Sequence, residues 1–179
     1  MTHTAPRSVS SDHIRERLAI HGFELPTPWQ VPSPAGARIP ASLVRRVGNR
    51  IYVSGHIPTS HDGVVTGPYG TVGDKVDLPT AQTAAVRTLL SLLASVEKAV
   101  GDLAEVKAWC SLHCMVNSAP DFTDFPAVFN PASRLLVDIF GDEIGAHARV
   151  AVGVAGLPWN LPVEIEAELE THSTERRNP

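Results

Sequence analysis

The stretch from Gly145 to Glu170, GAHARVAVGVAGLPWNLPVEIEAELE, constrains the fold more than any other part of the chain. Its second half alternates strictly between apolar residues and glutamates, a period of two that places one set on each face of a β-strand. The apolar set is Val163, Ile165, Ala167 and Leu169, and the other set is Glu164, Glu166, Glu168 and Glu170. A strand-like run of small apolar residues precedes it, with a Leu-Pro-Trp-Asn loop between. The pattern predicts a final hairpin with strands over 148–156 and 162–171, one face of which covers a core.

A single cation, Arg149, lies in the otherwise apolar first strand of this hairpin. A guanidinium stays protonated in proteins, and its burial without a partner is costly. Two kinds of partner can satisfy it: a glutamate on the neighbouring strand, or an anionic ligand. The planar fork of an arginine matches a carboxylate ligand through two parallel hydrogen bonds, which a lysine cannot do.

The rest of the sequence predicts two longer helices and further strands. Leu43–Val47 and Arg50–Ser54 flank Gly48-Asn49, a pair that tolerates the positive φ angles of a two-residue hairpin turn. The other predicted elements are a short strand at Val64-Val65, a helix over Pro79–Val100, a strand over Val106–Val116, and a helix from Asn130 (N-cap) and Pro131 to about Phe140. Helices that lie between strands of one sheet pack on it, so we expect an α+β fold with two helices on one face.

The first 40 residues predict an extension outside the sheet. Ser11 and Asp12 are expected to cap a short amphipathic helix that ends at Gly22. Its predicted apolar side is Ile14, Leu18 and Ile20. Five prolines follow within residues 23–40. Because each proline lacks an N–H donor and restricts the residue before it, this stretch is expected to be an extended connection that lies over the domain.

Size and charge limit the class of protein. A chain of 179 residues fits one domain, and a net charge of −4 gives no electrostatic reason to expect nucleic acid or an acidic membrane as a partner. No apolar run approaches the ~20 residues of a membrane span. Residues 1–13 have no apolar region typical of a secretory signal, and the chain has only two cysteines. Together these features predict a cytoplasmic protein.

The two cysteines are not expected to bind a metal or to form a disulfide. Cys110 and Cys114 lie in the predicted strand VKAWCSLHCMV, four residues apart, which corresponds to about 13 Å. That separation is too large for one zinc ion or one S–S bond. His113 is predicted on the opposite face, so both cysteines are interpreted as buried small apolar side chains.

Two motifs carry a resemblance to a known family. The run HARVAVGVAGLPWNLPVEIEAELE resembles the signature of the RidA/YjgF/L-PSP family, the reactive-intermediate (imine) deaminases, in which an Ala-Arg strand is followed by V-x-V, a Leu-Pro turn and an (I/V)-E-(I/V)-E-A strand. Upstream, IYVSGHIP (Ile51 to Pro58) is similar to the family's strand ending in S-G-(Q/H)-I-P. The resemblance covers residues 41–170 and implies a chorismate-mutase-like mixed sheet and a homotrimer with clefts between subunits. We expect an extension over 1–40, a RidA/YjgF-like domain over 41–171 and a tail over 172–179.

The resemblance also implies the two central residues of the site. Arg149 is expected to bind the carboxylate of a 2-imino or 2-keto acid, and Glu164 to position the attacking water. Only the resemblance selects Glu164 over Glu166, because the two side chains point the same way in a strand. Without it, the row of glutamates is typical of a solvated strand face.

Other residues are expected to line the pocket through the same resemblance: Ser54, Gly55, His56, Asn130 and the backbone near Ala151. Gly55 lets a backbone approach a ligand closely. His56 replaces the family's more usual glutamine, and a lone histidine after a strand can equally have a structural role. For Asn130, the alternative is the helix N-cap described above.

The implied function is hydrolysis of reactive enamine/imine intermediates, such as 2-iminobutyrate-like acids, to 2-keto acids and ammonia. No cofactor or metal is expected, because a protonated imine is already a strong electrophile. One alternative is a non-catalytic trimeric module that binds small carboxylates. It is favoured by Ala41, which stands where family members often carry a tyrosine. Another is an endoribonuclease, as the family's older name implies, but the acidic balance and the lack of a histidine pair argue against it.

Overall fold

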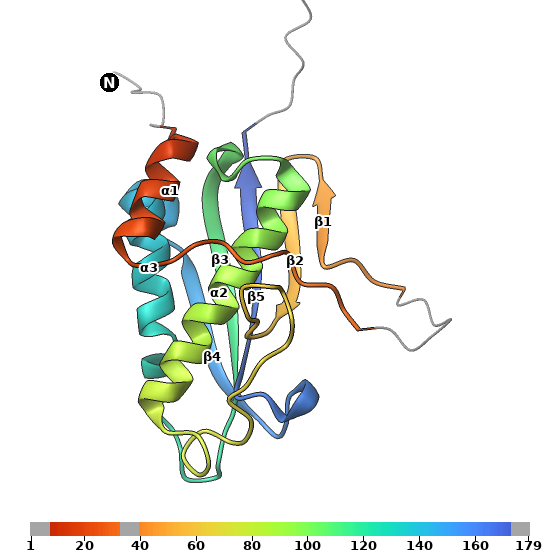
Figure 1. Ribbon diagram of the computed structural model, residues 1–179, viewed down its shortest axis with the longest axis vertical. Helices are drawn as coiled ribbons and strands as arrows, with labels where there is room; N and C mark the ends of the chain where they lie inside the picture. The colour runs from red at the N-terminus through yellow and green to blue at the C-terminus, as the bar shows by residue number, and fades with distance from the viewer. Residues whose placement is uncertain (1–7, 33–39, 173–179) are drawn as a thin grey trace, which may run out of the picture.

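The computed structural model describes residues 8–32 and 40–172, and within them the chain forms a five-stranded mixed sheet with three α-helices (Figure 1). The helices are α1 (Ser11–Ile20), α2 (Leu78–Val100) and α3 (Phe125–Gly145). The strands are β1 (Val44–Val47), β2 (Arg50–His56), β3 (Val106–Asn117), β4 (Ala148–Val154) and β5 (Val163–Thr171), with short 3-10 turns η1 (Leu103–Glu105) and η2 (Pro158–Asn160). The predicted α+β class is confirmed.

The strand order corrects the predicted final hairpin. The order is β1-β2-β5-β3-β4, so β3 lies between the two strands that the sequence suggested as partners. α3 carries the chain from β3 to β4, which pairs parallel to β3 at the sheet edge. β5 then inserts antiparallel between β2 and β3. An alternating pattern shows which face of a strand is buried, but it carries no information on the strand's neighbours.

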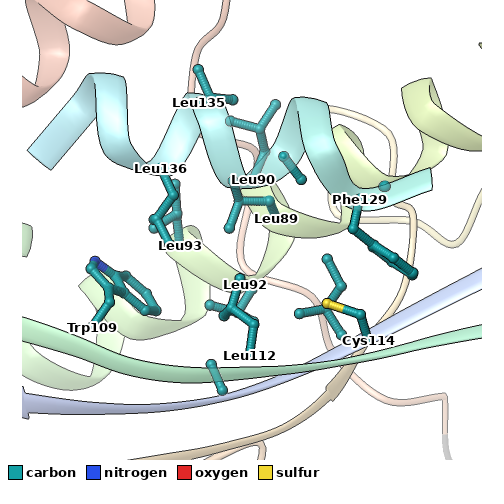
Figure 2. Close-up of a cluster of buried hydrophobic side chains, with 14 of the residues drawn as sticks. Leu89, Leu90, Leu92, Leu93, Trp109, Leu112, Cys114, Phe129, Leu135 and Leu136 are labelled. Atoms are coloured by element: carbon teal, nitrogen blue, oxygen red, sulfur yellow. The ribbon is translucent and has the colours of Figure 1, made fainter. Parts of the chain in front are cut away.

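α2 and α3 cover one face of the sheet, and the core lies between these layers (Figures 1 and 2). In Figure 2, leucines from both helices meet side chains of β3, including Trp109 and Leu112, which are 2% and 1% exposed. Asp77 caps α2 by accepting from the Thr80 N–H at 2.9 Å, and Gly101, with a φ of 92°, follows its last residue. The predicted helix over Pro79–Val100 is therefore confirmed, with one more residue at its start.

α3 begins six residues earlier than predicted. Its first residue is Phe125, with Pro126 in the first turn, so Asn130 is an interior residue and not the N-cap. Pro131 also lies inside the helix, where it cannot donate to the Ala127 carbonyl one turn earlier. The Gln82 Nε2 amide of α2 donates to that carbonyl instead, at 2.9 Å. A side chain from another helix thus satisfies the group that the proline leaves free, which a local capping pattern cannot indicate.

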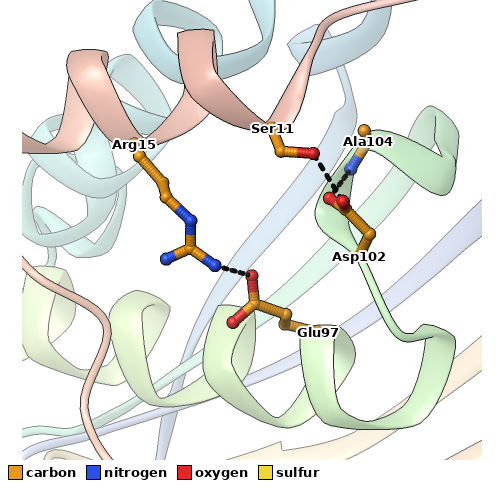
Figure 3. Close-up of polar contacts among 5 residues, drawn as sticks. All are labelled: Ser11, Arg15, Glu97, Asp102 and Ala104. Carbon is orange, nitrogen blue, oxygen red and sulfur yellow. Dashed lines mark hydrogen bonds and ion pairs between the residues drawn. The ribbon is translucent and has the colours of Figure 1, made fainter.

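α1 packs beside α3 and η1 at one end of the domain (Figure 1). Ser10 is its N-cap, in place of the predicted Ser11 and Asp12. Ser11 instead donates a hydrogen bond to the Asp102 carboxylate, and Arg15 pairs with Glu97 at 3.0 Å (Figure 3). The buried side is Ile14 and Leu18, whereas the predicted third apolar residue, Ile20, is 63% exposed.

The connection after α1 passes over α2 without joining the sheet, as predicted (Figure 1). Trp29 anchors it by packing with Ile57 and Leu161. The predicted strand at Val64-Val65 is wrong: only an isolated bridge between Thr59 and Val65 forms there. Residues 33–39, part of the predicted connection, lie outside the described residues, as does the predicted tail beyond His172. The division into an extension, a domain and a tail stays a prediction.

A β-bulge in β3 corrects the placement of the cysteines. The register with β5 shifts between Trp109 and Ser111, and this extra residue breaks the alternation. Cys114 is fully buried as predicted, but Cys110 is exposed. In residues 8–32 and 40–172, no group of three or more His, Cys, Asp or Glu side chains is arranged to hold a metal ion. Among the same residues, no helix combines the length and apolar character of a membrane span.

Candidate functional site

Arg149 lies on β4, on the helix-covered side of the sheet and at its edge, where α3 passes. Its Nη1 donates to the Ser133 hydroxyl at 2.9 Å, and its Nη2 donates to Asn130 Oδ1 at 2.9 Å and to the Pro126 carbonyl at 3.3 Å. All three acceptors are neutral. In the described part of the chain no carboxylate forms an ion pair with Arg149. The alternative of a glutamate on the neighbouring strand is therefore wrong for a single chain.

Close contact between β4 and the start of α3 makes this arrangement possible. A Cβ added at Gly153 would lie 2.6 Å from the ring of Phe125 and 2.7 Å from the Ser118 hydroxyl, so only glycine fits there. This contact brings the first turns of α3 over β4, and Asn130 faces Arg149 from the second turn. Ala151 follows on the same side of β4, opposite Cys114 of β3. Asn130, which was expected to line the pocket, thus contacts Arg149 directly, and the alternative role as N-cap is wrong.

Glu164 lies on β5, on the face of the sheet that the helices leave uncovered. A Cβ added at Gly55 would overlap the Glu164 Oε1 atom and lie 2.7 Å from its Cδ, so the absence of a side chain at Gly55 makes room for the carboxylate. A register shift between Val53 and His56 marks a bulge at this point of β2. Gly55 was predicted to let backbone approach a ligand, and in the structure it lets backbone approach Glu164.

The environment distinguishes Glu164 from the other glutamates of β5, which their alternation along the strand could not do. Glu166 pairs with His113 at 3.4 Å, Glu170 pairs with Lys107 at 3.4 Å, and Glu168 is exposed. Glu164 is half-buried, and in the described residues it has neither an ion pair nor a hydrogen-bond donor. Burial raises the pKa of its carboxyl group, and the negative charge of Glu166 raises it further.

The side chains next to Gly55 support the bulge. Ser54 is exposed, and its hydroxyl donates to the Ser42 carbonyl at 2.9 Å. His56 is fully buried and packs edge-on against Trp29, with ring centroids 5.7 Å apart. Its Nδ1 lies 2.7 Å from the Ser54 carbonyl, so Nδ1 carries the proton and donates. Burial lowers the pKa of this imidazole, and the bond to Ser54 opposes that shift. The His56 side chain supports the bulge from the core and forms no hydrogen bond with Glu164 in the described residues. The pocket role expected for His56 stays a prediction.

The predicted residues thus form two groups that a single chain does not bring together. One group, on β4 and α3, is Arg149, Ala151 and Asn130, and the other, on β2 and β5, is Ser54, Gly55, His56 and Glu164. Leu112 of β3 is paired with Arg149 on one side and with Ala167 on the other, three residues from Glu164. Two strand spacings and three residues of rise separate the Cα atoms of Arg149 and Glu164 by roughly 14 Å. Their side chains also point to opposite faces of the sheet.

Two further residues of the Arg149 group were not predicted. Ser133 accepts from Arg149, and its hydroxyl lies 3.0 Å from Nε2 of His147. A signal for Ser133 exists in the sequence, because residues three apart on a helix share a face, and Asn130 precedes it by three. His147 is two residues before Arg149 and directly precedes β4, but nothing local shows that it reaches α3.

Comparisons with known proteins agree with the fold and the motifs. A profile of the family described as Endoribonuclease L-PSP matches residues 35–170. Protein TCP17 of Trypanosoma cruzi is 38% identical over 168 residues, 92% of this chain and 98% of that protein. The crystal structure of Atu1372 from Agrobacterium tumefaciens, a protein of unknown function, is similar with a TM-score of 0.80 and 37% identity, over 90% of this chain and 94% of that one. A structure from Shewanella oneidensis MR-1, named only as a candidate endoribonuclease, shares the fold with a TM-score of 0.75 and 24% identity, over 88% and 98%.

The matched segment includes both motifs and all seven predicted site residues. The chain therefore belongs to the L-PSP family, which the sequence motifs indicated under the wider name RidA/YjgF/L-PSP.

Proposed function

We propose that this protein hydrolyses 2-imino acids to 2-keto acids and ammonia, in a cleft shared by two copies of the chain. One observation carries the proposal: each group of site residues contains a charge that the described part of the chain does not neutralise. Arg149 contacts only neutral acceptors, and the half-buried Glu164 has no donor. Partly buried charges without partners are a feature of ligand sites, since a fold gains nothing from leaving them unpaired.

Arg149 is suited to bind the carboxylate of the substrate. Three of its N–H groups are held by α3 and the remaining ones have no acceptor in the described residues, so the guanidinium is oriented and still able to donate. Its positive charge also offsets the electron donation of the substrate carboxylate, which makes the adjacent imine carbon more electrophilic. Backbone groups near Ala151 and Gly55 are available to bind the imine nitrogen.

Glu164 is suited to position the water and to move its proton. Water adds to the C=N carbon, and one of its protons passes by way of the Glu164 carboxylate to the nitrogen, which gives a carbon that carries a hydroxyl and an amino group. The hydroxyl proton then passes to the nitrogen by the same route as the C–N bond breaks, so the oxygen stays on the carbon as a ketone, and both protons of the water leave on ammonia. Burial raises the pKa of Glu164, and a carboxylate with a raised pKa takes up the proton of an attacking water more readily.

A shared cleft follows from the positions of the two charges. A small 2-imino acid cannot contact both Arg149 and Glu164 of one chain, because they lie on opposite faces of the sheet and roughly 14 Å apart. A second copy that brings its uncovered face to the β4 edge would place its own Glu164 and Gly55 near the first copy's Arg149. The homotrimer that the family resemblance implies provides such contacts in a closed ring.

Mixed assemblies test the proposal directly. Arg149→Lys and Glu164→Gln chains, each inactive alone, are unfolded, mixed in equal amounts and refolded together. If each cleft takes Arg149 from one copy and Glu164 from another, about a quarter of the clefts contain both native residues and activity returns to that level. A site within one chain cannot recover activity in this way. Arg45→Lys, at an exposed position on β1, is the matched control for the arginine substitution. A stable monomer in sedimentation, or no recovery with both variants assembled, would refute the shared cleft.

A binding module without catalysis is the second candidate, and Ala41 favours it. Ala41 is exposed and precedes Ser42, whose carbonyl holds the Ser54 hydroxyl, so the missing phenol would have stood beside the Glu164 group. Wild-type protein that binds a 2-keto acid, loses this affinity by about 1.5–3 kcal/mol in Arg149→Lys, and does not accelerate imine hydrolysis would support this candidate.

A further inference from the structure

A chain of hydrogen bonds connects Arg149 to the end of α3, and its direction is determined at one end. The Gly145 carbonyl can only accept, so His147 Nδ1, 2.7 Å away, must carry a proton and donate. In a neutral imidazole the other nitrogen, Nε2, is then an acceptor. The Ser133 hydroxyl, 3.0 Å from Nε2, therefore donates to His147. Its lone pairs remain for Arg149 Nη1 at 2.9 Å.

The end of α3 is folded so that this chain can form. Gly141, with a φ of 75°, interrupts the helix and turns the following residues back. A Cβ added at Gly145 would lie 2.8 Å from both the Leu136 carbonyl oxygen and the Val137 Cα, so the returning segment lies directly against α3. This close return places His147 beside Ser133, fourteen residues earlier in the chain.

We propose that Ser133 and His147 are positioning residues of the carboxylate site: His147 holds the Ser133 hydroxyl proton away from Arg149, and Ser133 in turn orients the guanidinium. The proposal rests on the proposed function, because it assigns a role toward the same anion. Without the His147 imidazole beside it, the hydroxyl proton would be free to turn toward the guanidinium, where two donors would face each other. With His147 in place, hydrogen bonds to Ser133, Asn130 and Pro126 together hold the plane of the guanidinium.

The same contact couples anion binding to a proton on His147. Burial lowers the pKa of His147, the bond to the Gly145 carbonyl opposes the shift, and the positive charge of Arg149 lowers the pKa further. An anion on Arg149 offsets that charge, so the pKa of His147 rises when the anion binds. A protonated His147 donates from Nε2 to one lone pair of the Ser133 oxygen, and the other lone pair still accepts from Arg149 Nη1, so the support of the guanidinium is kept. By linkage, anion binding takes up protons, and the affinity increases as the pH falls through the range in which His147 titrates.

Few other groups near this contact titrate between about pH 5 and 8. Arg149 on β4 and Arg134 on α3 stay charged, and burial raises the pKa of Cys114 on β3 to about 12. Glu164 of a neighbouring copy, whose pKa burial raises, is the exception, and its protonation would also favour an anion at low pH. The pH measurements are therefore made in the Glu164→Gln background, which removes that carboxyl group.

The binding test uses 2-oxobutyrate and calorimetry at fixed protein concentration. Ser133→Ala is expected to weaken binding about five- to tenfold, and Ser133→Thr, which keeps the hydroxyl, to stay within about twofold of wild type. In the Glu164→Gln background, affinity is expected to increase from about pH 8 to about pH 5, and His147→Gln to abolish that increase. His13→Gln, at an exposed site on α1, is the control. Equal affinities for Ser133→Ala and wild type, or a pH dependence that survives in His147→Gln, would overturn the proposal.

A second measurement decides the proposal without any ligand. Nitrogen-15 NMR of the imidazoles is expected to show His147 as the Nδ1–H tautomer, with a pKa that rises when Arg149→Met removes the nearby charge. An Nε2–H tautomer, or a pKa that does not respond to Arg149→Met, would refute the hydrogen-bond chain from His147 through Ser133 to Arg149. Wild-type protein that does not bind 2-oxobutyrate would refute the proposed function instead. The NMR result would then test this hydrogen-bond chain alone.

Discussion

Replacing Gly55 with alanine tests the position of the Glu164 carboxylate, on which the proposed chemistry depends. The added Cβ would overlap Oε1 and lie 2.7 Å from Cδ and 3.1 Å from Cγ of Glu164, so the whole end of that side chain must move. Gly55 does not have a positive φ, so alanine can adopt its backbone conformation without strain. The perturbation is therefore almost entirely steric and directed at one carboxylate.

The expected change in stability is small because two effects oppose each other. Forcing Glu164 out of its preferred conformation costs about 0.5–1.5 kcal/mol. Replacing glycine by alanine at a compatible position gains about 0.4–1 kcal/mol by restricting the unfolded chain. The difference lies within about 1 kcal/mol, which for a chain of this size shifts the melting temperature by no more than about 2–4 °C.

The expected change in turnover is large by comparison. A displacement of about 1 Å at a catalytic group can lower the rate about 100-fold, and Glu164 must move at least that far to clear the new methyl group. The assay is hydrolysis of an enzymatically generated 2-imino acid, compared with the spontaneous rate. Carbon-13 NMR of the Glu164 carboxyl group is expected to show its pKa falling toward the ordinary value, since the displaced carboxylate loses the burial that raises it.

Gly156→Ala is the matched control, because that glycine has no positive φ and no atom within 4 Å of an added Cβ. It is expected to behave as wild type in all three measurements. Gly55→Ala protein with wild-type turnover and an unchanged Glu164 pKa would show that the carboxylate does not lie against Gly55, and the assignment of Glu164 would fail with it.

Three further predictions follow from single contacts. Glu164→Gln is expected to melt higher than wild type at neutral pH and equally near pH 4, because a raised carboxyl pKa in the folded state lowers stability as the pH rises through it; equal melting curves at both pH values would contradict this. In a thiol-labelling assay, native Cys114→Ser protein is expected to react through Cys110, and native Cys110→Ser protein to react only after unfolding; fast labelling of the latter would contradict the burial of Cys114. Asp102→Ala removes the acceptor for Ser11 and for the Ala104 N–H (2.8 Å) and is expected to cost about 1–2 kcal/mol in thermal unfolding; an unchanged melting temperature would argue against this contact as an anchor of α1.

Periodicity and turn chemistry in the sequence were sufficient for most of the elements. The β1–β2 hairpin around Gly48-Asn49, the long helix α2 and the strand β3 are local patterns, and each formed within one or two residues of its predicted bounds. The errors occur where a residue distant in the sequence determines the local structure. Pro131 is tolerated inside α3 because Gln82 of another helix donates to the carbonyl that the proline leaves free, that of Ala127, 45 residues after Gln82.

The sequence indicated seven residues of the candidate site, but not their grouping. The resemblance selected Arg149 and Glu164, and nothing in the alternating pattern showed that β3 would come between their strands. Ser133 and His147 were missed for a similar reason, since their contact depends on the return of the chain after Gly141. Local patterns determine faces and ends of elements, whereas the partners of a charged side chain depend on the order of strands in the sheet.

That strand order has a direct consequence for the chemistry of Arg149. A hairpin closed at residues 157–160 would pair Val154 with Val163 and therefore place Arg149 directly opposite Glu168. Opposite charges at directly facing positions of two strands attract one another, so the arginine would be neutralised within its own sheet. With β3 inserted between the strands, the residue paired with Arg149 is Leu112, and the row of glutamates lies on the other face. The crossover through α3 thus separates Arg149 from four carboxylates that are near it in the sequence. α3 supplies neutral acceptors instead, and the charge of Arg149 remains available for an anion from outside the chain.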